Sequence, residues 1–234
     1  MLSLVVVVVT LWLGLNDELG LYIHPRYFVF TIVMALVGLV LVSAGFVRRR
    51  SFEVEDAGRL ATTLTGTGIV LLLVMGVAIV VVPPTTLTSA TATQREVNSG
   101  GLGTDADQTA ALIGAGDFEE LSVREWVSLL AQSTDPAFYA DKTARVTGFV
   151  TPDAQDPDNV FYVARFVVTC CAVDAQPIGV PVYLPGWQAE YEIDDWVQVT
   201  GRFDPSVSAA ATDPLALTPV EILPVDQPND PYVY

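Results

Sequence analysis

The chain has 234 residues, of which 51% are hydrophobic and 16% are charged, and its formal net charge is −16. Residues 1–83 hold five basic and five acidic residues, whereas residues 84–234 hold six basic and 22 acidic residues, which accounts for the whole net charge. A division of this kind argues against a soluble single-domain enzyme. The net charge of −16 also argues against a nucleic-acid binder, because phosphate neutralisation needs an excess of clustered Lys and Arg.

Residues 1–83 contain three apolar runs, which predict a transmembrane anchor with spans at about residues 1–15, 27–47 and 64–82. The second and third runs have 21 and 19 residues without a charge, which is enough to cross about 30 Å of hydrocarbon as helices. The first run lacks the charged start and the cleavage site of a signal peptide. Because it has only 15 residues, two spans plus an interfacial segment form the alternative.

The basic residues predict the orientation of this anchor. Residues 48–63, between the second and third runs, carry four of the eleven Lys and Arg residues, and short loops of this kind stay on the cytoplasmic side. The third span then places residues 84–234 outside the cytoplasm. We therefore expect a multi-pass protein of the cell membrane with an extracytoplasmic C-terminal domain.

A linker and a helix follow the anchor. Residues 84–117 are rich in Thr, Ser, Ala and Gly, which predicts an extended or flexible linker with room for a short helix. Residues 118–234 form the predicted C-terminal domain. It opens on a helix over residues 121–133, in which Ser122 and Glu125 fit a capping box and apolar residues recur at helical spacing.

Five β-like runs come next, separated by clusters of Pro, Asp and Gly. Five short strands favour a small closed barrel of the OB type over a sandwich, which usually needs about seven. Gly148 and Gly201 each lie inside a run, where Gly marks the bulge or sharp bend that barrel closure requires. The runs span residues 144–150, 160–170, 179–184, 196–203 and 215–223.

The expected fold is therefore a membrane-anchored α+β protein. Three N-terminal transmembrane helices precede a small OB-like five-stranded β-barrel domain, which carries one preceding helix. An unclassified β-rich domain is the alternative for the C-terminal part.

Cys170 and Cys171 are the two cysteines of the chain, and they are adjacent. As metal ligands, their thiolates attract Zn²⁺ or Cu⁺, provided that the chain turns there, because adjacent side chains of a regular strand point to opposite faces. As a vicinal disulfide, the pair would be strained and easily reduced, which suits redox sensing. In a structural role, one thiol packs in the core and the other is incidental. All three interpretations stay open.

Other candidate ligands are few. Asp174 and Arg165 flank the cysteines and offer carboxylate or guanidinium contacts, or are ordinary exposed turn residues. His24 is the one histidine of the chain, and the predicted topology puts it on the same side as the cysteines. It is either a further metal-ligand candidate or the cap of an interfacial turn at His24-Pro25. The cofactor stays open, with zinc or another transition metal as the candidate, and a closed four-ligand zinc site would need a partner.

Sequence motifs of catalysis are absent. The chain contains no Gly-rich phosphate loop, HExxH, GxSxG or EF-hand pattern, so we expect no enzymatic activity.

Three segments together resemble a known family. They are Tyr22-Ile23-His24-Pro25-Arg26, the run that ends in Val82-Pro83-Pro84, and the segment RFVVTCCAVDA from Arg165 to Ala175. In this order they resemble the small-subunit family of bacterial two-component membrane permeases. The resemblance implies a three-span anchor with an OB-like tail, a larger multispan permease as partner, and a link to transition-metal homeostasis, zinc in particular.

The expected function is a non-catalytic accessory subunit, anchored in the lipid bilayer beside a multispan membrane permease. Its acidic outer domain would contact the transported species or a metal ion through Cys170 and Cys171. The alternative is a free-standing extracytoplasmic metal- or redox-sensing module. Three explanations of the acidic surface stay open. It keeps the domain soluble and away from anionic headgroups, it concentrates cations near the membrane, or it reflects salt adaptation.

Overall fold

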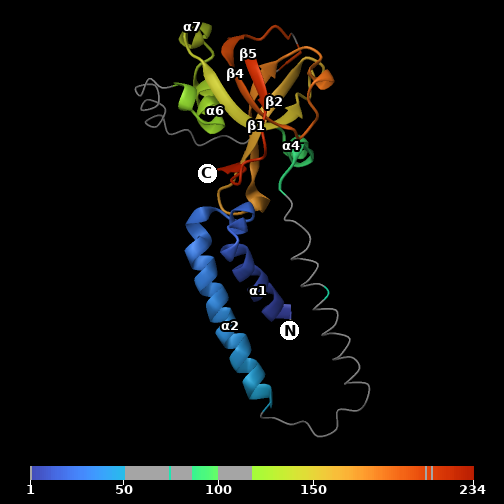
Figure 1. Ribbon diagram of the computed structural model, residues 1–234. Coiled ribbons are helices and arrows are strands. Elements are labelled where there is room, and N and C mark those ends of the chain that lie inside the picture. Colours follow the sequence, from blue (N-terminus) through green and yellow to red (C-terminus); the bar gives the residue numbers. More distant parts are fainter. Residues whose placement is uncertain (1, 51–73, 75–85, 100–117, 209, 212) are drawn as a thin grey trace. The chain divides into compact units, whose positions relative to one another are not determined.

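The computed structural model describes residues 2–50, 74, 86–99, 118–208, 210–211 and 213–234. The chain divides into two compact units, Met1–Thr85 and Thr86–Tyr234. Helices make up the described part of the first unit, and strands dominate the second (Figure 1).

Two packed helices form the described part of the first unit. A Cβ atom at Gly38 of the second helix would lie 3.3 Å from a Val7 methyl group of the first, so the missing side chain allows the helices to approach closely. The elements are α1 (Leu2–Leu15), the 3-10 turns η1 (Glu18–Leu21) and η2 (Pro25–Tyr27), and α2 (Phe28–Arg50).

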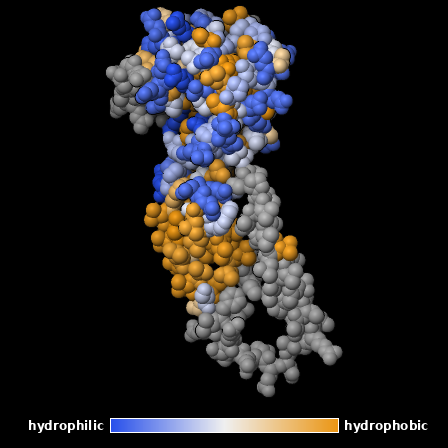
Figure 2. Space-filling model, viewed as in Figure 1, coloured by the Kyte–Doolittle hydropathy of each residue, from blue (hydrophilic) through white to orange (hydrophobic). Residues whose placement is uncertain are grey.

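Within the described residues, one helix is long and apolar enough to cross a membrane, over Pro25–Gly45. Little of it is buried, and the side chains of Val29, Phe30 and Val40 are 65–75% exposed. Figure 2 shows hydrophobic residues covering the visible face of α1 and α2. A soluble monomer rarely exposes so large an apolar surface, so the helix is compatible with membrane anchoring.

The three predicted spans have different outcomes. The run at 27–47 lies in α2 and its preceding turn. The run at 1–15 forms α1, whose 14 residues extend about 21 Å, short of the roughly 30 Å of hydrocarbon. It is therefore corrected from a span to a shorter apolar helix that packs on α2. Apart from Val74, the run at 64–82 lies outside the described residues.

A six-stranded sheet forms the centre of the second unit. The five predicted strands are present, and a sixth of two residues, which the sequence did not predict, pairs in parallel with the end of the second. The strands are β1 (Ala144–Pro152), β2 (Val160–Val167), β3 (Gln176–Tyr183), β4 (Trp196–Pro205), β5 (Leu215–Pro224) and β6 (Tyr232–Val233).

The strand pairings join five of these strands in a closed cycle. β1 pairs antiparallel with both β2 and β4, β2 pairs with β3, and β4 pairs with β5. β5 returns to β3 through a parallel contact of Leu217 with Val182. Each of these five strands therefore pairs with two others of the cycle, in the order β1, β2, β3, β5, β4 and back to β1.

Alternation along the strands explains the two buried clusters of the unit. Side chains on one face, such as Val146 and Val150 of β1, join a core that also receives Trp126 from α6 (Val123–Gln132). Side chains on the other face, such as Phe149, pack in a second cluster with Ala92. The period of two that predicted the strands thus separates the two clusters.

Gly148 and Gly201 lie where the backbone of another strand approaches. A Cβ atom at Gly148 would lie 2.4 Å from the carbonyl oxygen of Ala164, and one at Gly201 would lie 2.3 Å from that of Thr218. The β4–β5 register also shifts between Thr200 and Gly201. The prediction of a bulge or bend is confirmed at Gly201.

The predicted helix over residues 121–133 is α6, and its capping box is confirmed. The N–H of Ser122 donates to Oε2 of Glu125 at 2.7 Å, and the N–H of Glu125 donates to Oγ of Ser122 at 3.3 Å. The short elements around it and along the sheet are η3 (Phe118–Glu120), α7 (Pro136–Tyr139), η4 (Ala172–Asp174) and η5 (Trp187–Ala189).

Residues 86–99, which were assigned to the linker from the sequence, contain a helix and form hydrogen bonds with the rest of the second unit. The helix is α4 (Ser89–Arg95), and the N–H and Oγ of Ser89 donate to the carboxylate of Asp194 at 2.6 and 2.9 Å. This segment is an integral part of the second unit. The remaining linker residues, 84–85 and 100–117, lie outside the described residues.

Candidate functional site

The two cysteines lie in a turn that follows β2. The strand ends at Val167, and η4 begins directly after Cys171, so strand alternation stops before Cys170. The metal-ligand interpretation of the sequence requires such a turn. Cys170 is exposed, Cys171 is partly exposed, and neither forms a disulfide.

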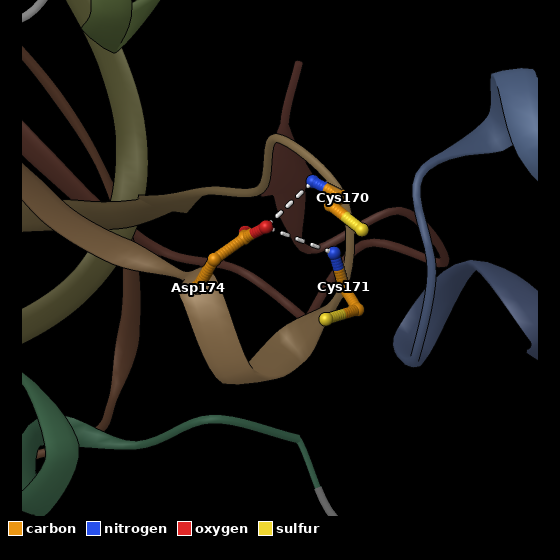
Figure 3. Close-up of side chains that lie close together, drawn as sticks. All are labelled: Cys170, Cys171 and Asp174. Carbon is orange, nitrogen blue, oxygen red and sulfur yellow. Dashed lines mark hydrogen bonds between the residues drawn. The ribbon is translucent and has the colours of Figure 1, made fainter.

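The carboxylate of Asp174 organises this turn. Its Oδ1 accepts the N–H of Thr169 at 3.0 Å, and its Oδ2 accepts the N–H groups of Cys170 at 2.8 Å and Cys171 at 3.2 Å. Figure 3 shows the two bonds to the cysteines. The carboxylate thus supplies the acceptors that a neighbouring strand would otherwise provide.

The sulfur atoms of both cysteines and a carboxylate oxygen of Asp174 lie within 4.8 Å of one another. Two sulfur ligands of one tetrahedral Zn²⁺ ion, at about 2.3 Å from the metal, are about 3.8 Å apart. Modest side-chain rotations would therefore bring both sulfurs onto a single ion.

The ligand set is incomplete on its own. A carboxylate has about four lone-pair positions, and three of those on Asp174 already accept backbone N–H groups. Asp174 therefore mainly fixes the turn and has one oxygen position left for an ion. Structural zinc sites close with four protein ligands, whereas sites that act on a bound species keep a position open. Two thiols and one carboxylate oxygen would make a site of the open kind.

Arg95 of α4 holds the far side of the turn. Its guanidinium donates to the carbonyl oxygen of Ala175 and, at 3.1 Å, to that of Val173. Sequence reasoning missed this residue because 78 positions separate Arg95 from Val173 and no local pattern connects them.

The remaining sequence candidates have other contacts. Nδ1 of His24, in the first unit, accepts the N–H of Arg26 at 3.1 Å and begins η2, which is the turn cap that the sequence offered as its alternative role. Arg165 donates to the carbonyl oxygen of Asp230 at 2.8 Å, and its guanidinium lies 5.4 Å from the ring centre of Trp196. Burial lowers the pKa of Arg165. The structure therefore brings together Cys170, Cys171 and Asp174.

A cavity of about 600 Å³ lies elsewhere in the second unit, between residues 92–99 and the end of β1. Asp153, Tyr162 and Asp213 line it, and the hydroxyl of Tyr162 contacts both carboxyl groups. Sequence reasoning did not single out these residues, because 51 positions separate Tyr162 from Asp213.

Comparison with known proteins identifies one family. Residues 105–234 match the family model described as the DUF1980 C-terminal domain. No curated protein and no solved structure matches the chain. The matched region contains the six strands and the cysteine turn, whereas Arg95 precedes it.

Proposed function

This chain belongs to the DUF1980 C-terminal domain family, and we propose that it is a non-catalytic accessory subunit of a two-component membrane permease that binds a thiophilic metal ion. The observation that carries the proposal is the cluster of Cys170, Cys171 and Asp174, whose ligand atoms lie within 4.8 Å of one another. Thiolates prefer Zn²⁺ and Cu⁺ over hard cations. Because three ligand atoms do not close a site, the partner subunit or water supplies the rest.

The membrane anchor of the proposal comprises spans at about residues 27–47 and 64–82, with the shorter apolar helix α1 packed beside the first. Helix α2 supports it, because its exposed apolar surface needs a nonpolar environment. The basic loop at 48–63 stays cytoplasmic in this arrangement, so the second unit lies on the extracytoplasmic side. A multispan permease beside the anchor is the proposed partner.

The second unit is, in this proposal, an OB-like barrel. The closed cycle of pairings among β1, β2, β3, β5 and β4 supports it, because a five-stranded Greek-key barrel closes in this way. β6 is then an addition beside the end of β2, where Val168 donates its N–H to the carbonyl oxygen of Val233 at 3.1 Å. This contact supports the backbone just before the cysteine turn.

The second candidate function is a free-standing metal- or redox-sensing module, which the exposed position of Cys170 also fits. Adjacent Cα atoms lie about 3.8 Å apart, whereas relaxed disulfides need at least about 4.4 Å. The metal-binding function is therefore favoured over a disulfide switch.

Metal titration of the full chain in detergent tests the site. We expect the wild type to bind one Zn²⁺ in competition with a chromophoric chelator, and the double variant Cys170→Ser/Cys171→Ser to lose at least about a hundredfold in affinity. Val173→Ala is the matched control, because this side chain of the same turn is 82% exposed. Equal binding by the double variant would contradict the proposal.

Co-purification tests the role as a subunit. We expect the chain, co-expressed with the proposed multispan permease partner, to be recovered as a complex in mild detergent. Recovery as a lone monomer, with metal binding intact, would favour the free-standing sensor.

A further inference from the structure

Tyr162 of β2 places its hydroxyl group between two carboxyl groups. The oxygen lies 3.0 Å from Oδ2 of Asp153 and 2.6 Å from Oδ2 of Asp213. Tyr162 is 7% exposed and Asp153 is 1% exposed. A tyrosine hydroxyl has one proton to donate, so it satisfies one carboxylate only. The other short contact would bring two oxygen lone pairs together unless that carboxyl group carries a proton.

The hydrogen bonds of Asp153 identify it as the acceptor of the pair. Its Oδ1 accepts the N–H groups of Gln155 at 2.8 Å and Asp156 at 2.7 Å, so the chain direction at the end of β1 depends on an accepting carboxyl group. Within the part of the chain that the structure describes, Tyr162 is the hydrogen-bonding partner of the Asp213 side chain.

We propose that Asp153, Tyr162 and Asp213 form a proton-dependent latch, in which a protonated Asp213 donates to Tyr162 and Tyr162 donates to Asp153. Asp213 lies just before β5, Tyr162 lies on β2, and Asp153 follows the end of β1. The latch therefore connects three strands across the cavity that all three residues line. When Asp213 loses its proton, two carboxylates compete for one hydroxyl proton. The Asp213 contact then lengthens and the cavity widens.

The surroundings favour the protonated form of Asp213. Burial raises the pKa of this carboxyl group; the Tyr162 hydroxyl lowers it, and the charge of Asp153 raises it. Glu96 also lines the cavity, and Asp156 follows the Asp153 turn. Among the described lining residues there is no Lys, Arg or His, so the neighbouring charges are negative and oppose ionisation.

The sign of the pH dependence follows from this shift. Because the pKa of Asp213 is higher in the folded than in the unfolded chain, the folded state holds the proton more tightly. Its contribution to stability is complete below the ordinary carboxyl value and is lost as the pH rises through the folded-state pKa. An ion-paired aspartate would show the opposite direction.

Asp213→Asn tests the latch, because an amide is a permanent donor with the shape of a protonated carboxyl group. We expect the Tm of the wild-type full chain in detergent to fall relative to that of Asp213→Asn as the pH rises above the ordinary carboxyl value. In Tyr162→Phe this difference should remain, because burial and the charge of Asp153 still disfavour the ionised form of Asp213. The double cysteine variant should keep it, because the latch is independent of the metal site.

Carbon-13 NMR of aspartate side chains provides a second measurement, which follows the titration of each carboxyl group in the folded wild-type chain directly. We expect one carboxyl signal, absent from Asp213→Asn, to titrate above the ordinary aspartate value of 3.8. Titration at or below that value, or identical pH profiles of Tm for the wild type and Asp213→Asn, would overturn the proposal.

Discussion

Cys170 and Asp174 are joined by a hydrogen bond from the backbone N–H of the cysteine to Oδ2 of the carboxylate, at 2.8 Å. The same oxygen also accepts the N–H of Cys171, so one atom fixes the direction of both cysteine residues. The carboxylate therefore holds the backbone from which both thiols project, and we expect metal affinity to depend on it even where it is not a ligand.

Removing this carboxylate should weaken metal binding. Asp174→Ala loses all three backbone acceptor bonds, each worth roughly 1 kcal/mol, and we expect Zn²⁺ affinity to fall at least about tenfold. Asp174→Asn should lie between alanine and wild type, because its amide keeps one acceptor oxygen. Competition titration measures both variants. Wild-type affinity in Asp174→Ala would show that the turn does not need the carboxylate.

Arg95 should support the same turn from α4. Arg95→Ala removes the donors to the carbonyl groups of Val173 and Ala175, and we expect a several-fold loss of Zn²⁺ affinity, because outer contacts of this kind tune a metal site. Arg202→Ala is the matched control, since Arg202 is an exposed arginine on β4. An equal effect of both substitutions would point to net charge rather than to the turn.

A methyl group at Gly201 should be poorly tolerated. The new Cβ would lie 2.3 Å from the carbonyl oxygen of Thr218, and we expect a loss of about 3 kcal/mol in the free energy of unfolding. Gly186 has a φ of 73° with nothing within 4 Å, so Gly186→Ala should cost only about 1 kcal/mol. Denaturant unfolding of both variants gives the comparison, and a reversed order would be inconsistent with the bulge.

Asn98 should connect the segment after α4 to the sheet. Its Nδ2 donates to the carbonyl oxygen of Gly179 and its Oδ1 accepts the N–H of the same residue, both at 2.9 Å. Asn98→Ala loses both bonds, and we expect a destabilisation of about 2 kcal/mol. Asn98→Asp keeps the oxygen that accepts the N–H of Gly179, but it places a carboxylate oxygen against the carbonyl of Gly179 in place of the amide donor. We therefore expect a destabilisation of similar size. Denaturant unfolding measures both, and Ser99→Ala, which alters no contact to the sheet, is the control.

Local signals explain how much of the fold the sequence predicted. Strand alternation and the Ser122 capping box depend on residues a few positions apart, and both are present. The second strand was predicted to extend to Cys170 and ends instead at Val167. The reason is that the carboxylate of Asp174 accepts the N–H groups of residues 169–171. The pairing of β6 escaped prediction, since two residues carry no periodic pattern.

Contacts across long stretches of chain explain what the sequence did not predict. The cysteine turn was a candidate because its residues are adjacent, and Asp174 lies only four positions from Cys170. Arg95 and the Tyr162–Asp213 pair are brought into place by the sheet, 78 and 51 positions from their partners. No spacing rule on a single sequence connects such residues.

X-ray absorption at the zinc edge, on the full chain loaded with one equivalent of Zn²⁺, tests the central claim most directly. We predict two sulfur ligands at about 2.3 Å, with oxygen or nitrogen in the remaining positions. In the variant Cys170→Ser/Cys171→Ser the sulfur shell should disappear. A shell of oxygen and nitrogen alone in the wild type would contradict metal binding by Cys170 and Cys171.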